Sequence, residues 1–273
     1  MSGYIHGTSP EEQHRLTLMN ALANAGSLRE LGLSGGERVL EMGSGLGQFA
    51  RLMARAAGPG GAVVGIESSE DQIAAALTLA RADGEGGLVD FRRGDALDPP
   101  LLPSERGAFD VVHARFLLEH LPDPAAAVRT MVAAVRPGGR IVLEDDDHDL
   151  LRLWPDCPRM GAVWDAYLES YRQLGCDPLI GRKLPRLLHE AGASPRRATW
   201  IFFGACAGDP MFPVVTANLA GVLRGAADAI LATGRVDAVG LALALDEFEA
   251  WSAAPGASFG LPIAWAEGVK PAV

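Results

Sequence analysis

Three glycines at alternate positions, preceded by a carboxylate, are the residues whose types and spacing bear most directly on chemistry. The segment 37–48 reads Glu-Arg-Val-Leu-Glu-Met-Gly-Ser-Gly-Leu-Gly-Gln, and it places Glu41 ahead of Gly43, Gly45 and Gly47. A short apolar run, a glycine loop and a helix predict that free backbone N–H groups face a ligand, because side chains there would hold the ligand away. Taken alone, the loop also fits a dinucleotide-binding fingerprint.

Two further carboxylates follow the next predicted strands. The strand at 62–67 ends on Glu67, about 20 residues past the loop, where a carboxylate commonly binds a ribose diol. The strand at 88–94 is followed by Asp95, which is placed to accept a hydrogen bond from an exocyclic amine. Since ligands bind at the carboxyl ends of parallel strands, we expect these side chains to lie at one edge of a sheet.

The elements that must position these residues alternate along the first half of the chain. Predicted strands cover 38–43, 62–67, 88–94, 109–114, 140–145, 197–206 and 258–267. Predicted helices cover 9–24, 46–57, 70–82, 116–120, 124–135, 157–175, 182–191, 212–232 and 236–252. Short strands that alternate with amphipathic helices indicate an α/β fold with a parallel sheet covered on both faces.

Four ordered motifs carry a resemblance to a known family. They are Val39-Leu40-Glu41-x-Gly43-x-Gly45-x-Gly47, Phe109-Asp110-Val111-Val112, Leu118-Glu119-His120-Leu121 and Arg136-Pro137-Gly138-Gly139. In this order the chain resembles the class I S-adenosylmethionine-dependent methyltransferases, of the ubiquinone/menaquinone-biosynthesis type, closely over 36–145 and loosely in the flanks. The resemblance implies a doubly wound, Rossmann-like sheet of seven strands in the order 3-2-1-4-5-7-6, with the last strand antiparallel, and a helical lid.

The same resemblance implies S-adenosylmethionine as the cofactor and assigns its contacts. The residues implied to bind it are Glu41, Gly43, Gly45 and Gly47 at the methionine and ribose parts, Glu67 and Ser68 at the ribose, Asp95 and Ala96 at the adenine, and the backbone of His113 at the methionine end. Two alternatives stay open: an NAD-dependent oxidoreductase and a non-catalytic S-adenosylmethionine-binding protein. The carboxylate of Glu41 inside its strand and the Arg-Pro-Gly-Gly turn both disfavour NAD.

The helices of the second half have no place in the sheet's alternation, so we expect them to form a lid over the site. The expected segments are an N-terminal helical cap (1–32), the cofactor-binding core (33–148), a lid insertion (149–180), a core helix and strand (181–208), a second lid insertion (209–253) and the last strand and tail (254–273). Aromatic residues in the lid suggest an apolar acceptor, although a lid's own core would need them equally.

Four residues are candidates for catalysis: His113, Arg115, Glu144 and His148. Methyl transfer needs a general base only if the acceptor must lose a proton early, as a phenol does. Arg115 could hold an acidic group of the substrate or pair with a nearby carboxylate. In the family the Glu119-His120 segment mainly packs a short helix, so we expect a structural role for it. The sequence leaves O-, N- and C-methylation open.

The acidic run 144–147 could suggest a metal site, since hard cations take several carboxylates. Neighbouring side chains on a strand point to opposite faces, so four in succession cannot converge on one ion. We therefore expect a solvated strand end, with one or two carboxylates facing substrate, and no metal.

Bulk composition restricts the classes of partner. The 273 residues carry a net charge of −10, which argues against a nucleic-acid backbone as the main partner. The three cysteines are widely spaced and form no CxxC pair, so neither a disulfide framework nor a zinc site is expected. The sequence suggests neither a signal peptide nor a membrane span. We expect a cytoplasmic enzyme acting on a small molecule, of undetermined oligomeric state.

Overall fold

The structure is a computed structural model that describes residue 20 and residues 23–272. The start of the helix expected over 9–24 lies outside the described residues. Residues 23–31 are helical, and this helix ends at Gly32, whose φ of 55° is in the left-handed region. Glycine is favoured at such a helix end because it has no Cβ to clash.

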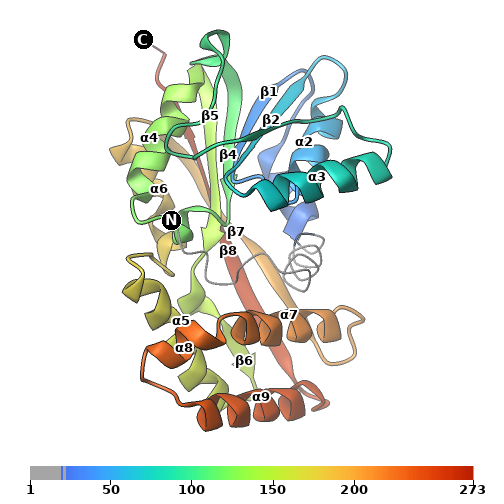
Figure 1. The fold of residues 1–273 in the computed structure, drawn as a ribbon, viewed down its shortest axis with the longest axis vertical. Helices are drawn as coiled ribbons and strands as arrows, with labels where there is room; N and C mark the ends of the chain where they lie inside the picture. Colours follow the sequence, from blue (N-terminus) through green and yellow to red (C-terminus); the bar gives the residue numbers. More distant parts are fainter. Residues whose placement is uncertain (1–19, 21–22, 273) are drawn as a thin grey trace.

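Within the described residues one sheet of eight strands organises the molecule (Figure 1). The strands are β1 (Arg38–Met42), β2 (Ala62–Glu67), β3 (Asp90–Arg93), β4 (Phe109–Arg115), β5 (Val135–Asp146), β6 (Arg152–Trp154), β7 (Ser194–Cys206) and β8 (Ser258–Val269). The order β3-β2-β1-β4-β5-β8 is hydrogen-bonded in sequence, and β7 pairs with the other edge of β8. The seven strands that were expected therefore have the expected order, with the last strand antiparallel between its neighbours, and the observed order differs by the addition of β6.

The expected number of seven strands was wrong by one. The additional strand, β6, pairs antiparallel with β8 between Trp154 and Ser258, beyond the end of β5. It has three residues, which is shorter than the four to eight that make a strand recognisable from its pattern.

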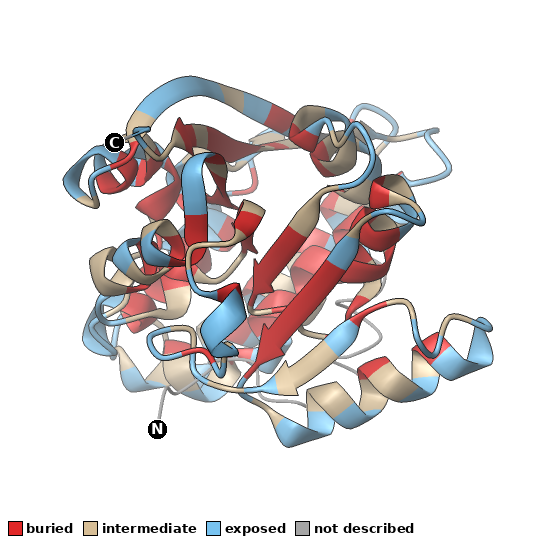
Figure 2. Ribbon diagram, turned by 90° about the horizontal axis from the view of Figure 1, so that it is seen from above, coloured by how far each residue is buried: buried red, intermediate tan, exposed pale blue. Residues whose placement is uncertain are grey.

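Helices cover both faces of the sheet (Figure 2). The helix at 23–31 and α2 (Gln48–Ala57) pack on one face, where Leu31, Phe49 and Trp265 belong to one core cluster. The helices α4 (Pro124–Ala134) and α6 (Leu184–Glu190) pack on the other, around Leu40, Val112 and Leu188. The helix α3 (Glu70–Ala82) flanks the edge strand β3 and its neighbour β2. This is the doubly wound arrangement expected from the sequence.

Four helices form a second body beyond one end of the sheet (Figure 1). They are α5 (Pro158–Gln173), α7 (Phe212–Gly225), α8 (Ala227–Ala232) and α9 (Ala238–Ser252). They share a hydrophobic cluster of their own, which includes Tyr167, Leu223 and Trp251. The long strands β7 and β8 run from the sheet into this body, so the two parts share a continuous backbone support. We call the four helices with β6 the lid.

Two helix boundaries differ from expectation for local reasons. The helix expected at 46–57 begins at Gln48, because Gly47 is left-handed with a φ of 69°. The helix expected at 212–232 is divided at Ala226 into α7 and α8. The glycine before this break, Gly225, has a low helix propensity and no side chain to pack.

The expectation of a solvated acidic strand end was wrong, because Glu144, Asp145 and Asp147 are at most 1% exposed. The strand continues beneath the lid instead of ending in water. Each carboxylate then has a partner of its own: Glu144 accepts from the Ser27 hydroxyl, Asp145 from the backbone N–H of Leu118, and Asp147 from Arg182.

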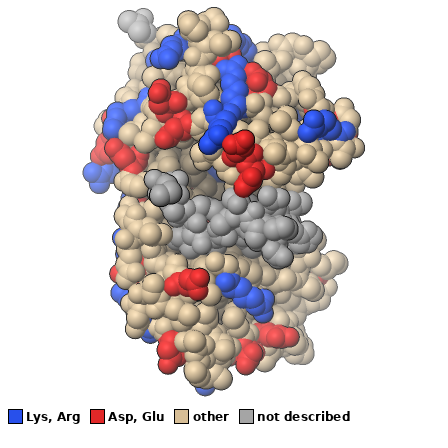
Figure 3. Space-filling model, in the orientation of Figure 1, with Lys and Arg blue, Asp and Glu red and all other residues tan. Residues whose placement is uncertain are grey.

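On the face shown in Figure 3, acidic and basic side chains are interspersed over both the sheet region and the lid. In the described part of the chain, no helix has the length and apolar character needed to cross a membrane. Cys157, Cys176 and Cys206 are all free thiols.

Candidate active site

A cavity of about 770 Å³ lies between the carboxyl ends of the central strands and the lid. One part is lined by the glycine loop and by the residues that follow β2 and β3, and the other by α5, α7 and β8. Of the expected cofactor residues, the cavity lining contains Glu41, Gly43, Gly45, Glu67, Ser68, Asp95 and Ala96. The sequence therefore located much of the glycine-loop half of this cavity.

The glycine loop needs its glycines for two different reasons. Gly43, Gly45 and Gly47 all have positive φ, at 73°, 52° and 69°, where other residues are strained. A Cβ on Gly47 would also lie 2.2 Å from Cζ of Phe91, whereas one on Gly45 would lie 3.2 Å from Oε1 of Gln72. Gly47 therefore serves close packing against β3, and Gly45 keeps the loop open to the cavity.

The carboxylate of Glu67 accepts a hydrogen bond from the glycine loop, and Glu67 also lines the cavity. Its Oε2 accepts a 3.0 Å hydrogen bond from the backbone N–H of Gly45, and its Oε1 accepts from the N–H of Ser69 at 2.8 Å. The Ser68 hydroxyl lies 3.2 Å from the same Oε1. These hydrogen bonds hold the carboxylate in one position at the cavity wall.

Asp95 stabilises a turn and also lines the cavity. Its Oδ1 accepts a 2.8 Å hydrogen bond from the backbone N–H of Leu97, so it does stabilise the following turn. It also lines the cavity together with Ala96. The hydrogen bond to the turn engages one of the two carboxylate oxygens, Oδ1.

Glu41 and Glu144 flank a buried imidazole beneath the loop. His113 Nδ1 lies 3.7 Å from Glu41 Oε1, and its Nε2 lies 4.0 Å from Glu144 Oε2. Burial would lower the pKa of His113, but the nearby carboxylates of Glu144 and Glu41 outweigh burial and raise that pKa above its ordinary value. Glu41 Oε2 is buried with no hydrogen-bond partner among the described residues, and Glu41 lines the cavity.

His113 and Glu144 were expected to contact cofactor or substrate, and the structure does not place them there. Neither residue belongs to the cavity lining. The ring of Phe49 packs 5.0 Å from the His113 ring and covers it. Both residues lie below the cavity floor, so we withdraw them as catalytic candidates.

Arg115 does reach the cavity, from the carboxyl end of β4. Its guanidinium donates hydrogen bonds to Oδ1 of Asn20 at 2.7 Å, Oδ1 of Asn24 at 2.8 Å and the hydroxyl of Ser27 at 3.1 Å. The charged group thus connects the helix at 23–31 with the sheet and faces the cavity.

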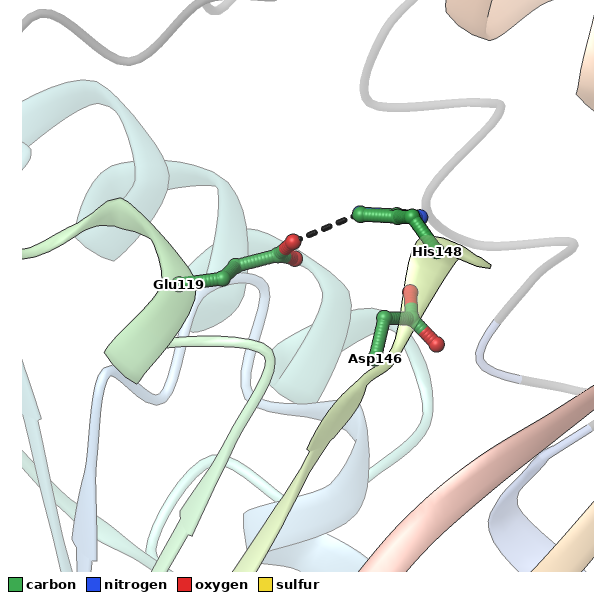
Figure 4. Close-up of side chains that lie close together, drawn as sticks. All are labelled: Glu119, Asp146 and His148. Carbon is green, nitrogen blue, oxygen red and sulfur yellow. Dashed lines mark hydrogen bonds and ion pairs between the residues drawn. The ribbon is translucent and has the colours of Figure 1, made fainter. Parts of the chain in front are cut away.

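The cavity lining also contains a close group of titratable side chains, Glu119, Asp146 and His148 (Figure 4). Nε2 of His148 lies 2.7 Å from Oε2 of Glu119, and both side chains are buried. One ligand atom from each of the three residues lies within 4.8 Å of the others, a spacing that could hold a metal ion. A metal ion bound through these atoms would compete with the hydrogen bond between His148 and Glu119.

Burial sets the protonation of this group. Burial lowers the pKa of His148 below its ordinary value, although Asp146 and Asp147 oppose the shift. Burial raises the pKa of neighbouring Asp145 well above its usual range, and the charges of Glu119 and Asp146 add to that rise. His148 is therefore a neutral imidazole near pH 7, able to accept a proton.

The sequence reasoning missed several cavity residues. Glu119 was expected to have a structural role, and Asn20, Asp146 and Gln48 were not singled out; all four line the cavity. No local signal marks the pairing of Glu119 with His148, because the two residues come from separate short helices 29 positions apart. The order of the strands that precede them was the available indication that they converge.

Comparison with protein families gives one matching model over more than half of the chain, described as a methyltransferase domain, at residues 14–197. The chain is 26% identical over 162 residues to the demethylmenaquinone methyltransferase of Lactococcus lactis subsp. lactis, covering 56% of this chain and 63% of that protein. It is 39% identical over 134 residues to the nocamycin O-methyltransferase of Saccharothrix syringae, covering 48% and 46%. The chain spans about half the length of the curated relatives it matches.

Solved structures share the fold at low identity. The geranyl diphosphate C-methyltransferase of Streptomyces coelicolor A3(2), solved with Mg²⁺, geranyl diphosphate and S-adenosyl-L-homocysteine, matches with a TM-score of 0.55 and 14% identity, covering 97% of this chain and 86% of that one. The [4+2]-cyclase SpnF matches with a TM-score of 0.56 and 22% identity, covering 92% and 81%. The fold is thus shared by proteins of different chemistry, and the choice among chemistries depends on the site.

Proposed function

The chain belongs to the family of methyltransferase domains, and from that premise we propose that it transfers the methyl group of S-adenosylmethionine to a hydroxyl group of a small, largely apolar molecule. The observation that carries the proposal is the cavity itself, which joins the glycine loop to the apolar inner face of the lid. S-adenosylmethionine supplies an activated methyl group, so the protein's task is to align donor and acceptor and to exclude water.

The cofactor half of the cavity fits this group. Glu67 offers a fixed carboxylate for the ribose, and Asp95 with Ala96 lies where the adenine would be held. The unpartnered Oε2 of Glu41 fits an ammonium group, since a buried carboxylate oxygen without a donor is costly. Gly45 leaves space for the backbone to approach the ligand.

The His148–Glu119 pair supports a hydroxyl as the acceptor. A hydrogen bond from Nε2–H to Glu119 leaves Nδ1 of His148 as the proton acceptor, and Nδ1 has no hydrogen-bond partner among the described residues. Glu119 would stabilise the imidazolium that forms when the hydroxyl proton is accepted. A positioned base of this kind contributes about 10²- to 10⁴-fold in rate.

The lid side of the cavity supports an apolar acceptor. Trp164, Tyr167, Tyr171, Val215, Leu219 and Val222 line it. The relatives named for demethylmenaquinone and for nocamycin are consistent with small organic acceptors. We propose that segments 149–180 and 209–253 act as the lid and that residues 1–32 act as a cap over the core.

Two measurements test the proposal in turn. S-adenosylhomocysteine should raise the melting temperature of the protein and NAD should not, because only a ligand that binds the native state stabilises it. Release of S-adenosylhomocysteine from S-adenosylmethionine should then be followed with a panel of phenols, each paired with its methoxy analogue. Turnover of the phenols alone supports O-methylation. Stabilisation by NAD alone, or turnover of acceptors without a hydroxyl, contradicts it.

A further inference from the structure

Arg115 is a buried cavity residue whose charge no direct ion pair matches within the described residues. It is 8% exposed and lines the cavity. Its printed hydrogen bonds go to the neutral oxygens of Asn20, Asn24 and Ser27, and none goes to a carboxylate. Buried charged groups are normally paired, because leaving water without a counter-charge costs free energy.

The nearest acidic groups act on Arg115 only at a distance. Burial lowers the pKa of Arg115, and the charges of Glu144 and Glu41 oppose that shift without hydrogen-bonding to the guanidinium. Glu144 Oε1 is already engaged by the Ser27 hydroxyl at 2.6 Å. The cavity face of Arg115 is therefore the place where an anion would complete the charge balance.

The guanidinium is held in a fixed position. Its central carbon lies 4.2 Å from the centre of the Phe49 ring and 5.5 Å from that of Phe116. Such stacking suits arginine and leaves the edges of its planar group free to donate hydrogen bonds. An anion that enters the cavity would meet a site that needs little rearrangement.

The register of the sheet places this group beside the glycine loop. Met42 of β1 is paired with Ala114 of β4, so the first loop residue, Gly43, follows β1 at the level where Arg115 ends β4. Glu41, with its unpartnered Oε2, lines the same part of the cavity. A carboxylate and a guanidinium thus flank one end of the loop, an arrangement complementary to an α-amino acid.

We propose that Arg115, assisted by Asn20, binds the α-carboxylate of the cofactor's methionine portion, while Glu41 receives its ammonium group. Asn20 also lines the cavity, and with its Oδ1 accepting from Arg115 it presents its amide nitrogen as a donor. This inference rests on the proposed function, since it assigns one end of the S-adenosylmethionine site. Arg115 is here a cofactor-binding residue and takes no part in proton transfer.

The test compares two ligands that differ only in the carboxylate. Titration calorimetry should measure the binding of S-adenosylhomocysteine and of its decarboxylated analogue to the wild type and to Arg115→Gln. We expect the wild type to prefer S-adenosylhomocysteine by about 10- to 100-fold, the effect of one charge-assisted contact. Arg115→Gln should abolish that preference by weakening S-adenosylhomocysteine alone, which isolates the interaction between the two groups.

Two further variants separate binding from structural support. Arg51→Gln removes another buried arginine, which pairs with Asp83 and Glu85 away from the cavity; it should lower stability and leave the ligand preference intact. Asn20→Asp keeps the side chain's shape and adds a negative charge beside Arg115, so it should reduce the preference even if Arg115→Gln fails to fold.

Two outcomes would overturn the inference in distinguishable ways. In the first outcome, Arg115→Gln still prefers S-adenosylhomocysteine over its decarboxylated analogue as the wild type does, or Asn20→Asp does so where Arg115→Gln does not fold. Arg115 would then have only a structural role, as the residue that connects the helix at 23–31 to the sheet. Failure of the wild type to bind either ligand would overturn the proposed function and this assignment with it.

Discussion

Nε2 of His148 lies 2.7 Å from Oε2 of Glu119, although 29 residues separate them in the chain. Both side chains are buried and both line the cavity. Burial and the carboxylate partner define the orientation of the imidazole, so its second ring nitrogen, Nδ1, is held in one position. This relationship gives the proposed proton transfer a specific pH dependence.

The acid limb of the pH profile should lie below the ordinary pKa of histidine. Because burial lowers the pKa of His148, the imidazole stays neutral as the pH falls past about 6.5, and kcat/KM should decrease only at lower pH. The free energy of unfolding should also decrease as the pH falls below about 6.5, because the unfolded chain binds a proton at His148 at a higher pH than the folded chain does. His148→Asn should remove the limb together with most activity. An acid limb centred above pH 7 in the wild type would contradict this assignment.

Glu67→Ala should weaken S-adenosylhomocysteine binding while leaving the fold intact. We expect a loss of about 10- to 100-fold, since the carboxylate would accept charge-assisted hydrogen bonds from the ribose and also holds the N–H of Gly45. Titration calorimetry measures the effect, and Glu70→Ala, an exposed carboxylate three residues on, is the matched control. Equal affinity in both variants would exclude Glu67 from the site.

Two glycine substitutions should separate packing from binding. Gly47→Ala places a methyl group 2.2 Å from Phe91 Cζ, so it should destabilise the fold by about 1–3 kcal/mol from crowding alone. Gly45→Ala meets only the end of the flexible Gln72 side chain at 3.2 Å, and its main cost should be ligand affinity. Denaturant unfolding and calorimetry on both variants distinguish the effects. The reverse ranking would show that Gly45 is the packing glycine.

The glycine-loop half of the cavity could be predicted because the sequence patterns that mark it are local. Left-handed glycines, strand ends and the spacing from Gly47 to Glu67 are properties of short sequence windows, and the strand alternation supplied the order in which they meet. The buried acidic strand end was not predictable in that way. Whether Glu144 meets water or the Ser27 hydroxyl, 117 residues away, depends on where the helix at 23–31 packs. The pair formed by His148 and Glu119 depends likewise on tertiary placement.

His113 should make the fold sensitive to base. Its raised pKa, produced by the nearby carboxylates of Glu144 and Glu41 against the effect of burial, means that the folded protein keeps a proton that the unfolded chain releases near pH 6.5. The stabilisation is complete below that pH and is lost as the pH rises through the folded-state pKa, by about 1.4 kcal/mol per unit of difference between the two states.

Denaturant unfolding between pH 6 and pH 9 measures that dependence. His113→Gln should flatten it, and His189→Gln, on α6 outside the buried group, should leave it unchanged. A wild-type stability that rises over this range would contradict the assigned direction.

The lid should lose stability independently of the cofactor site. Phe248 is 2% exposed and stacks on Trp251 with ring centres 5.2 Å apart, inside the hydrophobic cluster of the lid. Neither ring lines the cavity, so Phe248→Ala removes packing without touching a ligand. A buried phenylalanine replaced by alanine costs about 3–5 kcal/mol, and here that cost should fall on the lid helices.

Hydrogen exchange locates the loss. In Phe248→Ala, protection should fall in α5, α7 and α9 and stay unchanged in β1 and β4, because local opening follows cooperative units of structure. The affinity for S-adenosylhomocysteine should remain within about twofold, a change of less than half a kcal/mol. Val128→Ala, in the core cluster against the sheet, is the reciprocal control and should lower protection in the strands. A uniform loss of protection in Phe248→Ala, with loss of S-adenosylhomocysteine binding, would mean that lid and sheet unfold as one unit. The long strands β7 and β8, which enter both parts, would then be the physical link between them.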